Sequence, residues 1–172
     1  EQYPDHYAAK MLAIVLGGNM SSRMFLNVRE AKGLAYYISS TTDDYTDTGT
    51  FCTNAGVSVE RIDQAITAVI AEYKKCLQDS IPAAELKKAQ EFFKGKMVLR
   101  LEDSEEFAHL LGKNELLYNS SLTPDEVIQK IDAVKPEDLM RVAKNLIKED
   151  QLYLAVIGPY DNEQRFLDLM RF

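Results

Sequence analysis

Apolar side chains recur every three or four residues over most of the chain, which predicts a domain built mainly of amphipathic helices. Glycine, proline and cap-forming residues separate these periodic stretches and set their approximate ends. The predicted helices are, in chain order, 5–16, a short one from Ser21 or Ser22 to Gly33, 58–79, 82–101, one from 104 through 118, one from 123, 136–147 and 161–172.

Particular residues mark where these helices begin and end. Asp5, Ser58 and Ser104 stand at N-cap positions, where a side-chain oxygen can accept from a free backbone N–H. The segment Thr123-Pro124-Asp125-Glu126 is a capping box with proline at the first helical position. Gly33 suits the left-handed conformation that ends a helix, and Gly95 offers room for close packing inside the 82–101 helix.

Two stretches rich in β-branched and aromatic residues, 34–42 and 50–57, predict strands. Turn-forming residues separate them, so we expect an antiparallel hairpin. The run 152–157 is apolar without alternation, which predicts a strand in the interior of the sheet, covered on both faces. This order of elements predicts an α+β class fold, with helices layered on a mostly antiparallel sheet. No repeat or linker divides residues 1–172, so we expect a single domain.

The segment from Leu16 to Tyr37 carries the most specific pattern, a glycine loop, a short helix, a glycine stop and a strand entrance. Its residues are Leu16-Gly17-Gly18-x-Met20-Ser21-Ser22-Arg23-Met24-Phe25 followed by Arg29-Glu30-x-x-Gly33-Leu34-Ala35-Tyr36. This pattern resembles the C-terminal, non-zinc domain of insulinase/pitrilysin-type zinc metallopeptidases, the family of mitochondrial processing peptidase and its bacterial homologues. The resemblance covers most of the chain, and it is strongest from Gly17 to Val57. It implies the two-layer, processing-peptidase-like metallohydrolase fold.

The resemblance also implies roles for particular residues. Arg29 and Tyr36 match family positions that contact the backbone of a peptide substrate, and Gly17-Gly18 matches a close-packing turn that borders the cleft. A guanidinium and a phenol are both donors, so they can hold a carbonyl oxygen or the oxyanion formed during hydrolysis. Each also has a structural explanation, as a cation in the last helical turn and as a half-buried strand tyrosine. Strand alternation places Tyr37 on the opposite side from Tyr36, in the core or at an interface.

A zinc peptidase of this family needs the motif His-x-x-Glu-His, which this sequence lacks. Its two histidines, His6 and His109, are far apart, and we expect His109 to be solvated or interfacial rather than a metal ligand. Cys52 and Cys76 are too few and too irregularly placed for a disulfide framework or a zinc knuckle, so we expect free, mostly buried thiols. We therefore expect no metal and no catalytic residue in this domain, and zinc on a sister domain.

Composition limits the classes of partner. The formal net charge of -7 and a pI near 4.9, with no basic patch, argue against nucleic acid and against an anionic membrane surface. No apolar run approaches the ~18 residues of a membrane-spanning helix. We expect a cytoplasmic location in a bacterium. The chain begins at Glu1 rather than Met, which leaves an upstream targeting segment open.

These observations favour the substrate-binding, catalytically incomplete half of a zinc-dependent metalloendopeptidase. It would close on a zinc-bearing sister domain, in cis or in trans, around an extended peptide, and would have no activity alone. The alternative is a non-catalytic scaffold or interaction subunit of the same superfamily. A third hypothesis, a free-standing hydrolase that uses His109, requires activity without partners. The resemblance also implies one further strand before the first helix, whose absence here would expose a sheet edge and favour a homodimer.

Overall fold

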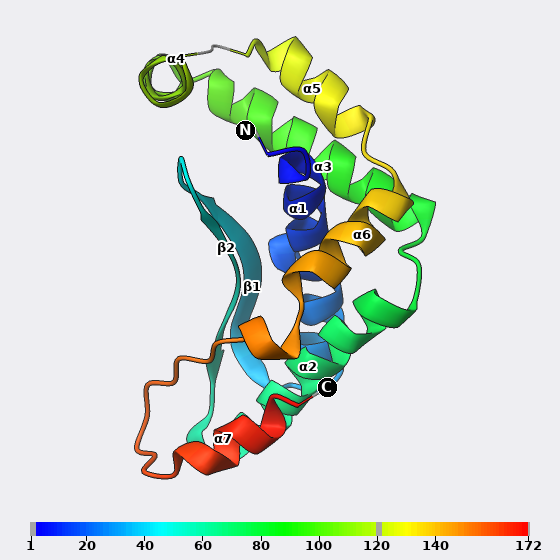
Figure 1. Ribbon diagram of the computed structural model, residues 1–172, viewed down its shortest axis with the longest axis vertical. Helices are drawn as coiled ribbons and strands as arrows, with labels where there is room; N and C mark the ends of the chain where they lie inside the picture. Colours follow the sequence, from blue (N-terminus) through cyan, green and yellow to red (C-terminus); the bar gives the residue numbers. More distant parts are fainter. Residues whose placement is uncertain (1–2, 120–121, 172) are drawn as a thin grey trace.

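The computed structural model describes residues 3–119 and 122–171. A long β-hairpin forms one side of the molecule, and most of the helices lie together on the other side (Figure 1). This arrangement confirms the predicted α+β class. The elements are α1 His6–Ala13, η1 Ile14–Gly18, η2 Phe25–Glu30, β1 Ala35–Asp44, β2 Gly49–Val57, η3 Val59–Arg61, α2 Ile62–Gln78, α3 Ala83–Leu101, α4 Ser104–Tyr118, α5 Pro124–Asp132, α6 Pro136–Leu146, η4 Glu149–Gln151 and α7 Glu163–Leu169.

Helix α1 and the π-helical turn η1 lie at the centre of the core. They pack against β1 on one side and against α3, α5 and α6 on the other. Met11, Leu12 and Leu16 have no exposed surface. Full burial of such a side chain stabilises the fold by about 1.5–3 kcal/mol, so this central segment supplies much of the stabilisation that the core provides.

The segment η1 lies unusually close to strand β1. A Cβ atom added to Gly17 would lie 2.3 Å from the backbone nitrogen of Ser40, closer than any real side chain approaches. At Gly18 an added Cβ would lie 3.0 Å from the side chain of Ile14. The close-packing glycine turn predicted from the sequence is therefore confirmed.

The predicted hairpin is confirmed as the antiparallel pair β1 and β2. Its inner face is tied to α2 by a chain of hydroxyl groups. The Ser40 and Thr53 hydroxyls are 2.7 Å apart, and the Tyr73 hydroxyl donates to Thr53 Oγ1 at 2.6 Å. Burial raises the pKa of Tyr73 to about 12, so this tyrosine remains a proton donor at neutral pH.

Several predicted helix caps differ in the structure. The capping box at Thr123 and Glu126 is confirmed, with both reciprocal hydrogen bonds present. The N-cap of α4 is Asp103, one residue before the predicted Ser104, and its carboxylate accepts from Glu105 N at 2.8 Å. A carboxylate is at least as good an acceptor as a hydroxyl at this position, so the earlier residue becomes the cap.

The predicted caps Asp5 and Ser58 occupy N-cap positions, but neither side chain makes a capping hydrogen bond. A tertiary contact explains why Asp5 makes no capping hydrogen bond: its carboxylate pairs with the guanidinium of Arg141 on α6. Ser22 Oγ is buried without a hydrogen-bond partner among the described residues, and Ser21 Oγ donates to Asn19 Oδ1 at 2.8 Å, so neither serine caps the short helix.

The prediction of a third, interior strand at 152–157 is wrong for the described residues. This segment is extended but pairs with neither strand of the hairpin. Tyr153 is 90% exposed and Ile157 is fully exposed. The apolar run specifies an extended conformation, but a strand also needs a neighbour that pairs with its backbone groups. In Figure 1 the segment is the orange stretch beyond β2, leading into α7.

Within the described ranges, no helix combines the length and the apolar character needed to cross a membrane.

The contact at Gly17 predicts the effect of a substitution. Replacing Gly17 with Ala should lower the free energy of unfolding by about 1–3 kcal/mol, because the new methyl group overlaps the β1 backbone. Gly95→Ala is the matched control. The prediction that Gly95 allows close packing is wrong, since an added Cβ there meets nothing within 4 Å. This control should gain about 0.5–1 kcal/mol of helix stability. Urea unfolding of both variants tests the contrast, and equal effects would contradict it.

His6 lies in the core near the tip of the hairpin, and its side chain is only 5% exposed. Its Nδ1 atom is 3.5 Å from Asp44 Oδ1, while Lys10 Nζ lies 3.0 Å from Asp44 Oδ2. Burial, and then the Lys10 cation, lower the pKa of His6 to about 4, against the opposing effect of Asp44. His6 is therefore neutral in the folded protein at pH 7.

Acidification should destabilise the protein through His6. The unfolded chain binds this proton near pH 6.5 and the folded protein only near pH 4, so stability falls as the pH drops through that window. The variant His6→Gln should show a shallower loss of the free energy of unfolding between these two pH values than the unmodified protein. The matched control is His109→Gln, which removes an exposed histidine on α4 and should keep the original slope. Equal slopes in the two variants would refute the role of His6.

Candidate functional site

The residues that the sequence predicts to bind substrate lie on one short segment, from η2 to the start of β1. The π-helical turn η2 packs against β1. After it the chain reverses through Gly33, whose φ of 58° confirms the predicted left-handed position. Leu34 N then donates to Val28 O at 3.0 Å, which closes the turn. Arg29 precedes this turn and Tyr36 follows it.

Arg29 lies in the last turn of η2, as predicted. Its guanidinium carbon is 4.6 Å from the centre of the Phe25 ring, one turn earlier on the same face. Stacking on an aromatic face orients a guanidinium while leaving its N–H groups available. Among the described residues, no hydrogen bond or ion pair to this guanidinium is found. Arg29 is therefore held in place and still able to donate.

Tyr36 lies at an irregularity in the hairpin. Ala35 pairs with Val57 and Tyr37 pairs with Gly56, so Tyr36 is the extra residue of a β-bulge. Bulges re-aim side chains, and Tyr36 is 86% exposed. The structural explanation of Tyr36 as a half-buried strand tyrosine is therefore wrong. Of the two positions predicted for Tyr37, the core is wrong, because the bulge breaks the alternation and leaves Tyr37 55% exposed, with its ring over Gly56. A position at an interface stays a prediction.

The start of the same segment is held by Arg23. Its Nε and Nη2 atoms donate to the two carboxylate oxygens of Glu85 at 2.8 and 2.6 Å, and its Nη1 donates to Cys76 Sγ at 3.4 Å. The bond to Glu85 raises the pKa of Arg23, and burial raises the pKa of the Cys76 thiol to about 11. Cys76 is therefore a neutral thiol and no nucleophile. The sequence pattern included Arg23 but gave no sign of its partners, which come from α2 and α3.

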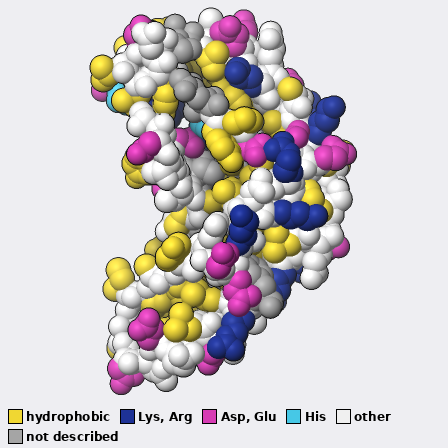
Figure 2. Space-filling view, in the orientation of Figure 1, with side chains coloured by type: hydrophobic (Ala, Val, Ile, Leu, Met, Phe, Trp, Pro, Cys, Tyr) yellow, Lys and Arg dark blue, Asp and Glu magenta, His cyan; other side chains and the backbone are white. Residues whose placement is uncertain are grey.

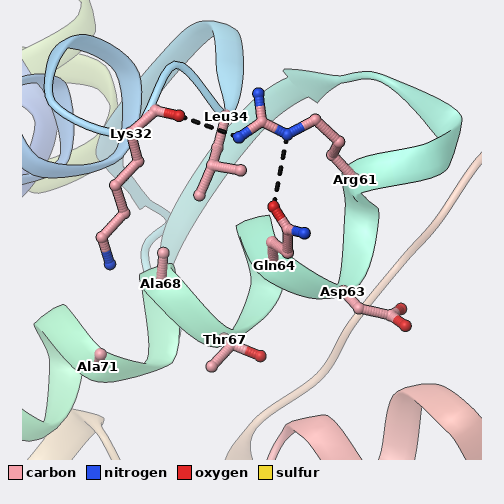
Figure 3. Close-up of a pocket in the computed structure, with 8 residues that line it drawn as sticks. All are labelled: Lys32, Leu34, Arg61, Asp63, Gln64, Thr67, Ala68 and Ala71. Carbon is pink, nitrogen blue, oxygen red and sulfur yellow. Dashed lines mark hydrogen bonds between the residues drawn. The ribbon is translucent and has the colours of Figure 1, made fainter.

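A cavity of about 570 Å³ lies between the turn that follows η2 and the first three turns of α2 (Figure 3). Its lining residues are Lys32, Leu34, Arg61, Asp63, Gln64, Thr67, Ala68 and Ala71. Arg61 reaches from the start of α2 past Leu34 to the carbonyl of Lys32. No sequence motif singles out Arg61.

The donor groups of this chain do not fit a zinc site. No group of three or more His, Cys, Asp or Glu residues that could hold a metal ion occurs within residues 3–119 and 122–171. His6 is buried beside Asp44, and His109 is exposed on α4. The cysteines are free thiols, as predicted, with Cys76 buried and Cys52 partly buried.

Apolar side chains gather on the lower part of the surface seen in Figure 2, where the 152–157 segment and α7 lie in Figure 1. Tyr153, Leu154, Ile157 and Leu167 are the large apolar residues exposed in this part of the chain. A contiguous exposed apolar surface commonly marks an interaction site.

Comparison with known proteins identifies relatives of this chain. A family profile described as the Peptidase M16 inactive domain matches residues 1–93. The "Uncharacterized zinc protease YmxG" of Bacillus subtilis is 36% identical over 91% of this chain and 38% of its own length. The "Uncharacterized zinc protease SCO5738" of Streptomyces coelicolor is 32% identical over 92% of this chain and 34% of its own length. The chain thus spans little more than a third of these relatives.

Solved structures show the same architecture. A protease from Helicobacter pylori matches with a TM-score of 0.74 and 25% identity, over 87% of this chain and 36% of its own. A chain of Complex III2 from Candida albicans matches with a TM-score of 0.75 over 86% of this chain and 37% of its own; at 21% identity it supports the fold alone. Since the family profile covers more than half of the residues and the bacterial zinc proteases align with nine-tenths of them, the chain belongs to the Peptidase M16 inactive-domain family.

Proposed function

We propose that this domain is the substrate-binding, catalytically incomplete half of a zinc-dependent metalloendopeptidase. It closes on a zinc-bearing sister domain, on the same chain or on a partner chain, and holds an extended peptide between them. The observation that carries the proposal is the pair of donors Arg29 and Tyr36 at the two ends of one turn, neither of which is hydrogen-bonded to another described residue. The domain alone hydrolyses no peptide, and we place the complete enzyme in the bacterial cytoplasm.

The chemistry of the two side chains suits an extended peptide. Such a peptide presents carbonyl oxygens at regular spacing, and both a guanidinium and a phenol donate to them. Neither donor is hydrogen-bonded to another described residue of the domain, so no internal hydrogen bond has to be broken when a peptide binds. Pre-oriented donors lose less conformational entropy on binding, and this favours tight binding.

Gly17 and Gly18 belong to the same proposal as the border of the peptide cleft. In the structure both glycines allow close packing, since Gly17 lies against Ser40 and Gly18 against Ile14. Proximity to the peptide stays a prediction.

We also propose that one further strand lies between β2 and the Leu152–Ile157 segment in the assembled protein. Among the described residues β2 pairs only with β1, and the 152–157 segment pairs with neither strand. The two run the same way, because the Tyr160 hydroxyl, beyond the segment, donates at 3.2 Å to the carbonyl of Val59, beyond β2. A strand antiparallel to both would satisfy the backbone groups on each side and cover Tyr153 and Ile157.

The role of the two donors can be tested in the full-length enzyme. Arg29→Ala and Tyr36→Phe should each lower kcat/KM for peptide hydrolysis by about tenfold or more, because a hydrogen bond to the substrate is lost. Zinc content and the unfolding midpoint should stay unchanged.

Two control variants separate this role from the structural explanations. Lys144→Ala removes an exposed cation from the last turn of α6, and Tyr45→Phe removes a hydroxyl from a tyrosine that is 62% exposed beyond β1. Both should retain full activity. Full activity in Arg29→Ala and Tyr36→Phe would refute the substrate-binding role, and a full-length protein that holds no zinc would favour the scaffold hypothesis.

The unpaired sheet edge should make the 172-residue chain self-associate as its concentration rises. The variant Ile157→Lys places a charge on the extended segment and should shift sedimentation towards the monomer. Leu116→Lys is the matched control, because Leu116 is 83% exposed on α4, away from the sheet. A protein that remains strictly monomeric at high concentration would rule out the proposed homodimer.

A further inference from the structure

We infer that Arg61 is a positioning residue for the peptide-binding donors: it fixes the turn that sets Arg29 relative to Tyr36. The inference rests on the proposed function. Three of its five N–H groups are bonded within the domain, two of them to the turn, so we assign Arg61 to the turn rather than to the peptide.

The contacts of Arg61 are made to two consecutive backbone carbonyls. Its Nη1 donates to Gly33 O at 3.0 Å and its Nη2 donates to Lys32 O at 3.0 Å. The planar guanidinium fork matches this pair of acceptors, as it matches the two oxygens of a carboxylate. A weaker bond from Nε to Gln64 Oε1, at 3.4 Å, orients the fork from the other side (Figure 3).

The position of Arg61 in the chain explains why it reaches back to this turn. It is the last residue of η3 and directly precedes α2, whose N-terminal dipole disfavours a cation. The Lys32 and Gly33 carbonyls, just beyond the end of η2, carry partial negative charge and accept from the guanidinium. The guanidinium therefore points away from the N-terminus of α2, where a cation is unfavourable, and towards backbone carbonyls, where it is favourable.

The Arg61 contact spans a hollow beside the turn. A cavity of about 570 Å³ lies between Lys32 and α2, and the guanidinium crosses it to reach the Lys32 carbonyl. The backbone of Arg61 is itself well anchored. Its N–H donates to Ser58 O at 3.1 Å, and the next residue, Ile62, is buried in the core. Arg61 thus transmits the fixed position of α2 to the turn.

The geometry places the fixed carbonyls between the two donors. Arg29 lies three residues before Lys32, and Tyr36 lies three residues after Gly33. Without the Arg61 contact, rotation of the turn would change the separation of the two donors without altering either side chain. Small errors in such positioning are costly in catalysis, because they reduce the fraction of correctly held substrate.

The test compares variants in the full-length enzyme. Arg61→Ala should lower kcat/KM roughly tenfold, and Arg61→Lys should lie between this variant and the unmodified enzyme, since one ammonium cannot hold both carbonyls in a planar fork. The effect should vanish in a background that already carries Arg29→Ala and Tyr36→Phe, because a positioning residue acts only through the residues that it positions. Hydrogen exchange at the Leu34 amide, which closes the turn, should be faster in Arg61→Ala, while α1 amides keep their protection.

Arg165→Ala is the matched control. Arg165 is an arginine beside the same end of α2, where it bonds Asp63 at 2.9 Å and does not touch the turn. It should retain full activity and normal exchange at Leu34. Arg61→Ala with normal Leu34 exchange, or with faster exchange but full activity, would overturn the inference while the donor variants remain impaired. Full activity in the donor variants would instead refute the proposed function, and the exchange measurement would still decide whether Arg61 holds the turn.

Discussion

The close approach of the central helix to strand β1 is the constraint on which the rest of the structure depends. It is possible only because Gly17 has no side chain at the point where it meets the Ser40 backbone. From there the chain turns directly into η2, which packs along the same strand. A side chain at Gly17 would separate η1 from the hairpin and so displace the segment that carries Arg29 and Tyr36.

Two arginine side chains other than Arg29 hold that segment at its two ends. Arg23 bonds Glu85 in a two-pronged contact at the start, and Arg61 holds the Lys32 and Gly33 carbonyls at the end. Both contacts join residues far apart in sequence, and both use the rigid geometry of the guanidinium group. The domain thus fixes the backbone between its ends while Arg29 and Tyr36 remain open to a partner molecule.

The domain also presents surfaces that its own described residues leave open. The Leu152–Ile157 segment is extended and apolar, with Ile157 fully exposed, while β2 pairs on one edge. The exposed apolar surface lies in the same region (Figure 2). An unpaired strand edge beside an exposed apolar run favours association with further polypeptide.

The sequence alone determined the helical periods, the hairpin, the left-handed Gly33 and the family resemblance, because each depends on local propensity or on a contiguous pattern. Tertiary structure decided what depends on contacts between distant segments. It paired the Asp5 carboxylate with Arg141 instead of with a free N–H of the first helical turn, and among the described residues it left 152–157 unpaired because a strand needs a neighbour. The bulge at Tyr36 likewise arises from the register between two strands, and the contact of Arg61 spans 28 residues. Local pattern therefore located the candidate donors, and only the folded chain showed what holds them in place.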